Sequence, residues 1–385
     1  MKKNLGVVLS VLVLIAVAAG GYKSYINNVE GNKNGTASGN SPGGLNLPGL
    51  GSSHPETQNA QSLKLLVGSA KFAFLKDPKL TEILAKEGIA LDLIKSESFE
   101  KDKVRLAELD AVWPAGSNSA ADWTATIPAA ATFPVFSTPL ALASWKALMP
   151  VFETSGLAKT TGAAHGDFYL DKALPLMLKG VRWNQLQGNT VFNVNKGFLV
   201  TTPDLRKSNT GALYIATLAY IQNGNEVPTD AGKAEALTDK LAPLITRQGF
   251  QEETLAGPFE DYLGQGMGKA PLVLIYESQF LEAKRAGKLG DNHFLLYPQP
   301  GLVLKHIFVA KSANGKKLGE LLANNKDIQK IAAQYGFRTN DQKVFAQEAK
   351  AIGLDAPELL NLADTPTTPV LEAMTAALIR KMDGH

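Results

Sequence analysis

The stretch LVTTPDLRKSNTGALYIATLAYI, residues 199–221, sets the organisation expected for this chain. An apolar strand end at 197–200 leads into a polar turn, and an apolar helix follows the turn. The turn combines a proline, a glycine and three hydroxyl or amide side chains: Pro203, Ser208, Asn209, Thr210 and Gly211. The first N–H groups of such a helix have no intrahelical partner, and with the helix dipole and nearby hydroxyls they form an anion site that needs no lysine. The alternative is that Ser208 or Asn209 only caps the helix.

The composition is that of a globular protein. The chain has 385 residues, of which 45% are hydrophobic and 19% charged, which is enough for two halves with hydrophobic cores. The net charge of +3 is too small to argue for nucleic acid as a partner. The absence of cysteine excludes disulfides, thiolate metal sites and a cysteine nucleophile.

Residues 1–26 are typical of a membrane signal. Two lysines precede an uncharged run, Asn4 to Tyr22, which would span roughly 28 Å as a helix, close to the thickness of a bilayer core. The lysines place the short N-terminal end in the cytoplasm, so we expect a single-pass anchor in the cell membrane and a periplasmic or extracellular folded domain. A cleaved signal peptide is the alternative, because Ala16, Ala18 and Ala19 resemble a cleavage region. Residues 27–62, rich in Gly, Asn, Ser and Pro, are predicted to be a flexible linker.

From residue 63 onward, strand and helix patterns alternate. We expect strands at 63–69, 89–94 and 111–120, with helices between them. This order predicts an α/β fold with a mostly parallel sheet that is covered by helices on both faces. Ligands of such sheets lie at the carboxyl ends of the strands, where Gly68, Ser69 and Ser117 fall.

Two further segments carry polar residues inside apolar surroundings. FPVFSTPLALASWK, residues 133–146, holds Ser137 and Thr138 between two prolines, which favours an edge strand or a crossing segment over a central, fully paired strand. Residues 272–275 are predicted to form a buried strand with Tyr276 and Glu277 at its carboxyl end. No metal site is expected, since His306 lies in an apolar strand without a second ligand at helical or strand spacing.

Together these patterns resemble the type II periplasmic solute-binding proteins of ABC importers, in the sulfate, molybdate and phosphate branch, and above all their membrane-anchored relatives. The resemblance covers residues 63–340. Four segments carry it: the Gly68-Ser69 turn, the helix start at 208–211, LVLIYES at 272–278, and LLYPQPGLVLKHIFVA at 295–310. In many relatives a Gly-Thr sequence follows the Tyr-Pro turn, whereas here Leu302 follows Gly301.

The resemblance implies a two-lobed fold in which the ligand is held between the lobes. It places crossing segments at 133–146 and 298–310, lobe 1 at 63–135 and 305–385, and lobe 2 at 147–297. The ligand-binding residues that it implies are Gly68, Ser69, Ser117, Ser137, Thr138, Ser208, Asn209, Thr210, Gly211, Tyr276 and Glu277. Most are neutral donors, which suit a desolvated oxyanion. A carboxylate at Glu277 would repel an anion unless the ligand is protonated or cationic.

The expected function is capture of a small, anionic solute by a membrane-anchored binding protein, without catalysis, cofactor or nucleic acid. The expected partners are a small-molecule or oxyanion ligand and an ABC permease or another envelope protein. One alternative is a tethered interaction domain of the same fold that has lost its ligand. Another is a serine acyl-enzyme of the penicillin-binding type, because residues 98–101 fit S-x-x-K and residues 159–162 approximate K-T-G, although the middle S-x-N element is missing.

Overall fold

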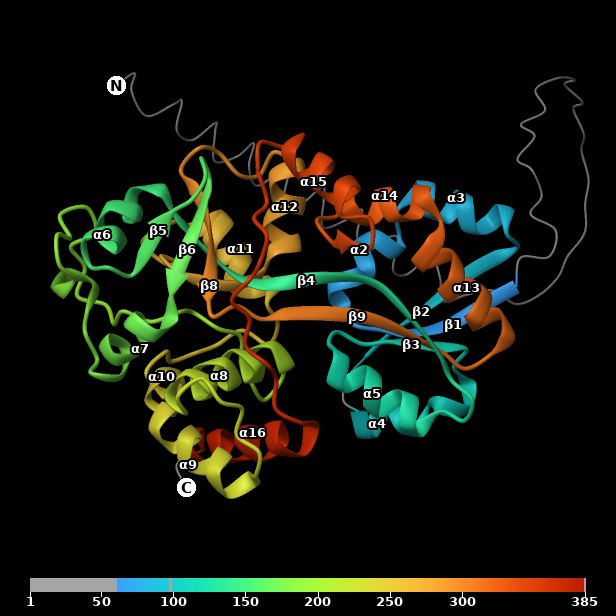
Figure 1. Ribbon diagram of the computed structural model, residues 1–385, viewed down its shortest axis with the longest axis horizontal. Helices are drawn as coiled ribbons and strands as arrows, with labels where there is room; N and C mark the ends of the chain where they lie inside the picture. Colours follow the sequence, from blue (N-terminus) through green and yellow to red (C-terminus); the bar gives the residue numbers. More distant parts are fainter. Residues whose placement is uncertain (1–60, 97–98, 384–385) are drawn as a thin grey trace, which may run out of the picture. The chain divides into compact units, whose positions relative to one another are not determined.

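The computed structural model describes residues 61–96 and 99–383, all within the compact unit Thr57–His385 (Figure 1). The predicted anchor or signal, nearly all of the predicted linker, and Ser98 of the S-x-x-K pattern lie outside the described residues. None of the helices in the described ranges has the length and apolar character needed to cross a membrane.

A ten-stranded sheet runs through the described part of the chain, with the strand order β2-β1-β3-β9-β4-β8-β6-β5, and with β7 and β10 also paired to β4. The strands are β1 (Gln61–Val67), β2 (Ile89–Lys95), β3 (Ala111–Trp113), β4 (Ala131–Trp145), β5 (Ala158–Thr160), β6 (His165–Tyr169), β7 (Val273–Tyr276), β8 (His293–Gln299), β9 (Val303–Ala310) and β10 (Arg338–Thr339). The third predicted strand is shorter than expected. It ends at Trp113. A helix begins at Ser117, directly after Gly116, whose φ is 105°.

The expectation of a mostly parallel sheet is wrong. β1 runs parallel to β2 and β3, and β6 runs parallel to β8. All the other pairs of the sheet, including those of β4 with β7, β8, β9 and β10, are antiparallel. The sheet is mixed because β4 and β9 run antiparallel to each other and pair along most of their length. The two segments expected to cross between the lobes are therefore neighbouring inner strands of the sheet.

β4 also overturns the expectation that its prolines keep it from the centre of the sheet. Pro134 lies opposite Ile307 and Pro139 opposite Val303, and the register shifts between Pro134 and Phe136. A bulge of this kind accommodates a residue that cannot donate to the ladder. The first part of β4 pairs with β9 and β10, and the second part pairs with β7 and β8. This one strand therefore connects the part of the sheet around β1–β3 with the part that contains β5–β8.

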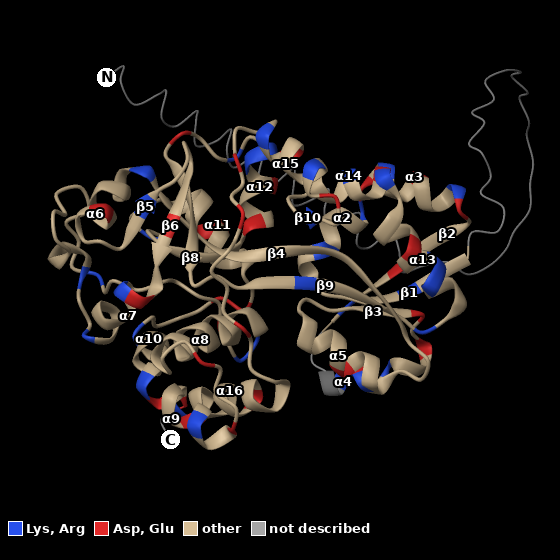
Figure 2. Ribbon diagram, in the orientation of Figure 1, with Lys and Arg blue, Asp and Glu red and all other residues tan. Residues whose placement is uncertain are grey.

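Helices cover the sheet on both faces. Their bounds are α2 (Phe72–Leu75), α3 (Pro78–Lys86), α4 (Phe99–Val104), α5 (Ser117–Thr126), α6 (Met149–Thr154), α7 (Leu170–Leu178), α8 (Asn209–Gln222), α9 (Ala231–Leu241), α10 (Pro243–Thr246), α11 (Ala256–Gln265), α12 (Glu277–Arg285), α13 (Ala313–Asn324), α14 (Lys326–Gln334), α15 (Gln342–Lys350) and α16 (Thr368–Met382). Figure 2 shows that the Lys, Arg, Asp and Glu residues are spread over helices along the whole sheet. β4 and β8 carry none of these four residue types.

Successive side chains of a strand point to opposite faces of the sheet, so each face has its own hydrophobic core. In β1, Leu65 and Val67 pack with α2, α3, α13 and α14, whereas Leu66 faces the opposite side with Trp123 of α5. We call the elements around β1–β3 the first half. They include β9, which pairs with β3, and β10, which directly follows the core residue Phe337. A larger core joins β5–β8 with α6–α12, and we call these elements the second half.

The last helix departs from the expected lobe boundaries. Leu371, Met374 and Leu378 of α16 belong to the core of the second half, and α16 packs against α8 and α9 (Figure 1). Residues 305–385 are therefore not all part of the first half. α16 is amphipathic, and its apolar side is covered by α8 and α9 rather than by the helices that directly precede it in the chain.

Candidate functional site

α8 begins without a side-chain cap, so the capping alternative is wrong. Ser208 has extended backbone dihedrals at the N-cap position, and no side chain accepts a hydrogen bond from the first turn. The backbone N–H of Ser208 donates to the Asp204 carbonyl at 2.8 Å, and the Gly211 N–H donates to the Ser208 carbonyl at 3.2 Å. Ser208 is half-buried and Asn209 is exposed. The N–H groups of Asn209 and Thr210 and the Ser208 hydroxyl are therefore available to a ligand, as an anion site at a helix N-terminus requires.

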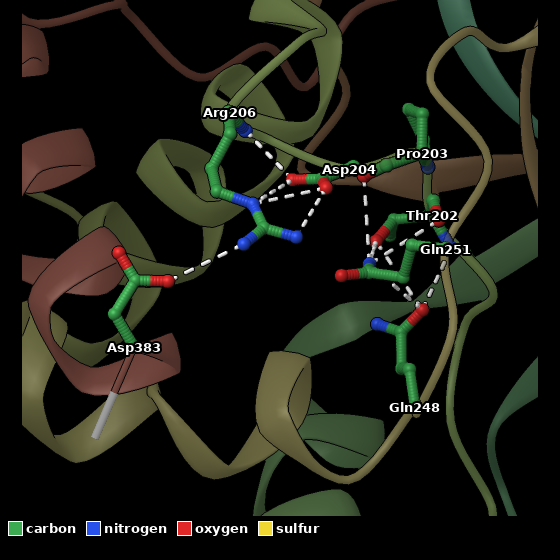
Figure 3. Close-up of polar contacts among 7 residues, drawn as sticks. All are labelled: Thr202, Pro203, Asp204, Arg206, Gln248, Gln251 and Asp383. Carbon is green, nitrogen blue, oxygen red and sulfur yellow. Dashed lines mark hydrogen bonds and ion pairs between the residues drawn. The ribbon is translucent and has the colours of Figure 1, made fainter.

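The loop that leads into α8 is held by side-chain amides (Figure 3). The Thr202 N–H donates to Gln248 Oε1 at 2.9 Å, and Gln251 Nε2 donates to Thr202 Oγ1 at 2.9 Å. Gly211 lies close to the same loop, since a Cβ at this position would lie 3.0 Å from the Pro203 carbonyl oxygen. A glycine at 211 thus allows the loop to pack directly on the first turn of the helix.

A charged pair fixes the middle of this loop (Figure 3). The Arg206 guanidinium binds the Asp204 carboxylate, with Nη2 at 2.6 Å from Oδ2, and also reaches Asp383 near the chain's end at 3.3 Å. The Asp204 side chain is largely buried, and the hydrogen bonds from Arg206 lower its pKa below the usual value. The turn before α8 is consequently held in place before any ligand binds.

Thr210 and Tyr276, two of the predicted ligand residues, lie together. Thr210 Oγ1 and the Tyr276 hydroxyl are 2.7 Å apart, and both residues are buried. Burial raises the pKa of Tyr276, so the phenol stays protonated near neutral pH. This bond connects the start of α8 with the carboxyl end of β7, whose Tyr276 lies opposite Leu140 of β4. Each hydroxyl already has a partner, and a ligand would share these hydrogen bonds rather than meet free groups.

Glu277 is occupied by protein groups. Arg338 binds it through two hydrogen bonds of 2.7 Å, from Nε to Oε2 and from Nη2 to Oε1, and the Tyr297 hydroxyl donates to Oε1 at 2.6 Å. Glu277 is fully buried, and burial together with the Glu277 carboxylate raises the pKa of Tyr297 well above its usual value. The expected repulsion between Glu277 and an anion is therefore removed, because Arg338 neutralises the carboxylate. The geometry gives Glu277 a structural role.

The middle of β4 connects these groups. Ser137 lies opposite Arg338 of β10 and Lys305 of β9, and is half-buried. Thr138 is fully buried, and its Oγ1 accepts a hydrogen bond of 3.3 Å from the backbone N–H of Ser278 in the first turn of α12. Two consecutive residues of one strand thus contact both halves.

Gly68 and Ser69 lie at the carboxyl end of β1, as predicted. Gly68 is half-buried, and Ser69 is exposed at the start of a single 3-10 turn, Ser69–Lys71. The turn buries Lys71, whose Nζ lies 3.2 Å from Nδ1 of His306 on β9. The His306 ring is 5.3 Å from that of Phe136, the residue before Ser137. A continuous set of contacts therefore connects the Gly68 turn to the middle of β4.

Ser117 has different surroundings from those expected, because it opens α5 instead of following a strand directly. Its neighbour Asn118 donates from Nδ2 to the Pro366 carbonyl at 2.6 Å, and Asp122 accepts a bond of 2.9 Å from Thr368 Oγ1. α5 of the first half is thus bound to the start of α16.

Three residues that gather near the predicted ones were not predicted themselves: Arg338, Tyr297 and Lys71. Arg338 and Tyr297 reach Glu277, and Lys71 reaches His306. Neither their spacing in the sequence nor their residue type indicates these contacts.

Two surface cavities lie elsewhere on the described part of the chain. One, of about 590 Å³, lies between α3 and β2, and the other, of about 450 Å³, lies beside α7 and is lined in part by Arg182 and Arg247. Neither is lined by a predicted ligand residue. Within residues 61–96 and 99–383, no three His, Asp or Glu side chains are grouped so that they could hold a metal ion.

Comparison of the fold identifies its class. The ferric ion-binding protein A of Pasteurella haemolytica, in its apo form, matches with a TM-score of 0.54 and 12% identity, covering 84% of this chain and 98% of that one. An ABC transporter solute-binding protein of Thermotoga lettingae, bound with α-D-tagatose, matches with a TM-score of 0.53 and 12% identity, covering 84% and 95%. The sulfate-binding protein SubI of Mycobacterium tuberculosis matches with a TM-score of 0.46 and 14% identity, covering 77% and 92%.

The solved structures that the chain resembles are type II periplasmic binding proteins, and the mixed sheet with flanking helices is the fold of that class. No protein-family model and no curated protein matches the sequence.

Proposed function

We propose that this protein is a solute-binding protein that holds a small anionic ligand where α8 and β7 meet the middle of β4. The observation that carries the proposal is the uncapped start of α8, fixed by the Asp204–Arg206 pair and joined through Thr210 to Tyr276. Free N–H groups at a helix N-terminus bind anions without a countercharge. The strand at this point belongs to both halves, so a ligand there would contact both.

We further propose that residues 1–26 anchor the domain outside the cytoplasmic membrane and that 27–62 tether it. An ABC permease or another envelope protein is the partner that this arrangement serves. The fold itself does not fix the ligand, because the two structures named above with TM-scores over 0.5 are those of an iron-binding and a sugar-binding protein. The anionic class is inferred from the donors at the start of α8.

The acyl-enzyme alternative has little structural support. The segment with the S-x-x-K pattern follows β2, and Lys159 lies in β5, at the opposite end of the strand order. The two motifs of a serine acyl-enzyme would have to meet at one site. The ligand-free interaction domain remains the second candidate, because the hydroxyls of Thr210 and Tyr276 satisfy each other without a ligand.

A thermal-shift screen tests the proposal. The full-length chain in detergent would be heated with sulfate, phosphate, molybdate, polyamines and amino acids. A solute that binds only the folded state at about 100 times its Kd stabilises it by about 2.7 kcal/mol, which raises the melting temperature measurably. We expect an anion to give the largest shift. A chain that no solute shifts, but that co-purifies with a second envelope protein, would be an interaction domain instead.

A further inference from the structure

The first half contains a buried lysine without an acidic partner. Lys71 has no exposed surface, and its Nζ contacts His306 Nδ1 at 3.2 Å and the Pro114 carbonyl at 3.5 Å. The ring of Trp113 lies 5.6 Å from Nζ. In the described part of the chain, Lys71 forms no ion pair with any carboxylate. A buried ammonium normally has an anionic partner, so this position lacks the group that would stabilise its charge.

Two more nitrogen atoms beside Lys71 lack partners. His306 Nε2 and Trp113 Nε1 are buried, and no hydrogen-bond partner is present for either of them. Both rings pack against Phe136, with centroid distances of 5.3 and 5.1 Å. Native structures rarely leave buried polar groups unsatisfied, and such groups call for an explanation such as an absent ligand or water. Lys71, His306 and Trp113 thus form a cluster of buried nitrogen groups that has few acceptors. The acceptors present are the Pro114 carbonyl and, in the tautomer with an unprotonated Nδ1, the His306 ring.

The Gly68 turn provides an approach to this cluster. Gly68 has ordinary extended dihedrals, φ −69° and ψ 143°, so its backbone does not require glycine. A Cβ at this position would lie 3.6 Å from Lys71 Nζ, and no other atom outside the adjacent residues lies within 4 Å of it. Glycine therefore leaves open the space next to the amine, at a turn whose next residue, Ser69, is exposed.

We propose that Lys71 is the cationic contact for the ligand's anionic group, a carboxylate or oxyanion that enters beside Gly68, and that binding is accompanied by uptake of one proton from solvent. This inference rests on the proposed function and names the charged determinant of that site. An anion beside Nζ would supply the acceptor that the cluster lacks, and would favour the charged form of the amine. The donors at the start of α8 and at Tyr276 are neutral, and Arg338 beside Ser137 is already paired with Glu277, so Lys71 would add a full positive charge to the site.

The electrostatics of the cluster agree with uptake of a proton by Lys71 when an anion binds. Burial lowers the pKa of Lys71 to about 7, and burial followed by the Lys71 charge lowers the pKa of His306 well below its usual value. His306 is the one titratable group among the contacts described for Lys71, since Trp113, Pro114 and Phe136 carry no charge. Above pH 7 the free amine is mostly neutral, so an anion must draw in a proton to form the ion pair. About one pH unit below 7 the amine is almost fully charged, and affinity no longer changes with pH.

The test is titration of the full-length protein in detergent with sulfate, molybdate and acetate at pH 6.0 and pH 8.5. Binding is measured by the melting temperature and by tryptophan fluorescence. These anions do not titrate in this range, so any pH dependence belongs to the protein. We expect the affinity of the wild type to fall by up to about 30-fold between the two pH values. Lys71→Met should bind at least tenfold more weakly at pH 6.0 and show no pH dependence.

Two further variants test whether an anion reaches Lys71 beside Gly68, and whether loss of any nearby lysine has the same effect. Gly68→Val suits the extended backbone and places methyl groups over Nζ, so it should abolish anion binding while the chain remains folded. Lys79→Met, which removes an exposed lysine on the neighbouring α3, should behave like the wild type. Wild-type affinity and pH dependence in Lys71→Met or Gly68→Val would overturn the proposal and leave solute binding intact. If only neutral or cationic solutes bind, the role of Lys71 and the anionic class of the ligand both fail while solute binding itself stands. A protein that no solute shifts contradicts both proposals.

Discussion

Glu277 and Arg338 form a largely buried ion pair that connects the two halves, with two hydrogen bonds of 2.7 Å between carboxylate and guanidinium. Glu277 is the first residue of α12, which packs in the second half, and Arg338 lies on β10, which pairs with β4 opposite Ser137. The pair therefore crosses the middle of β4, next to the residues that we propose as the ligand site. Its position makes it a structural support for that site.

Arg338→Met should destabilise the protein strongly. The substitution leaves the Glu277 carboxylate buried with only the Tyr297 hydroxyl as a partner, and breaking a buried pair in this way costs about 3–5 kcal/mol. Glu277→Gln with Arg338→Met together should recover part of the loss, because no buried charge remains. Urea unfolding measures both. Glu82→Gln, which breaks the exposed pair with Lys86, is the control and should leave the midpoint unchanged.

An equal midpoint for Arg338→Met and the wild type would show that the pair contributes nothing to stability. It would also remove the reason for treating Glu277 as neutralised.

Stability should rise with pH between about 7 and 10.5 because of Lys71. Its pKa is about 7 in the folded state and 10.5 as a free side chain, so in this window the unfolded chain binds a proton that the folded chain has lost. The free energy of unfolding gained from pH 7 to 10.5 is at most about 5 kcal/mol, because one proton contributes about 1.36 kcal/mol for each pH unit. His306, with a pKa lowered by burial, should cause a further loss of stability as the pH falls below its usual value near 6.5.

Denaturant unfolding of the ligand-free protein at several pH values measures this slope. Lys71→Met should remove the rise between pH 7 and 10.5 and should be more stable than the wild type at pH 7. Lys79→Met should retain the rise. A wild-type stability that is flat across this range would show that Lys71 keeps an ordinary pKa in the folded state.

Ser208→Ala should leave stability almost unchanged, since the hydroxyl does not cap α8. Removing a true cap costs about 0.5–2 kcal/mol. Asp230 provides the matched control, because its carboxylate accepts a hydrogen bond of 2.8 Å from the Lys233 N–H at the start of α9. Asp230→Ala should therefore lower the free energy of unfolding by that amount. If Ser208→Ala destabilises the protein as much as Asp230→Ala, the hydroxyl is a cap and is not held free for a ligand.

The parts of the fold that local pattern determines could be predicted from the sequence. β1, β2 and α8 lie close to their expected positions because each is a distinct apolar segment bounded by polar or glycine-containing turns. The place of β4 could not be predicted, since proline normally argues against a central strand and the bulge that accommodates it depends on the partner β9. The same applies to α16, whose amphipathic pattern does not indicate which half it covers.

The contacts among the candidate site residues follow from the sequence only in part, and for similar reasons. The sequence places Thr210 and Tyr276 in one predicted site, and their hydroxyls lie 2.7 Å apart, although ligand binding there stays a prediction. Arg338 and Tyr297 meet Glu277 from 61 and 20 residues away, and a sequence gives no sign of such a contact. Lys71 was overlooked because lysine is almost never fully buried, so the residue type itself predicted an exposed side chain.

The central claim is that a solute is held at the start of α8, and one titration tests it most directly. The solute with the largest thermal shift would be titrated calorimetrically into the wild type and into Ser208→Ala/Thr210→Ala, with circular dichroism to confirm that the double variant is folded. Thr210→Ala leaves the Tyr276 hydroxyl without its partner and should cost about 1–3 kcal/mol of stability, which a folded domain tolerates. We predict that the folded double variant no longer binds. Unchanged affinity in the double variant would contradict the account and place the ligand elsewhere.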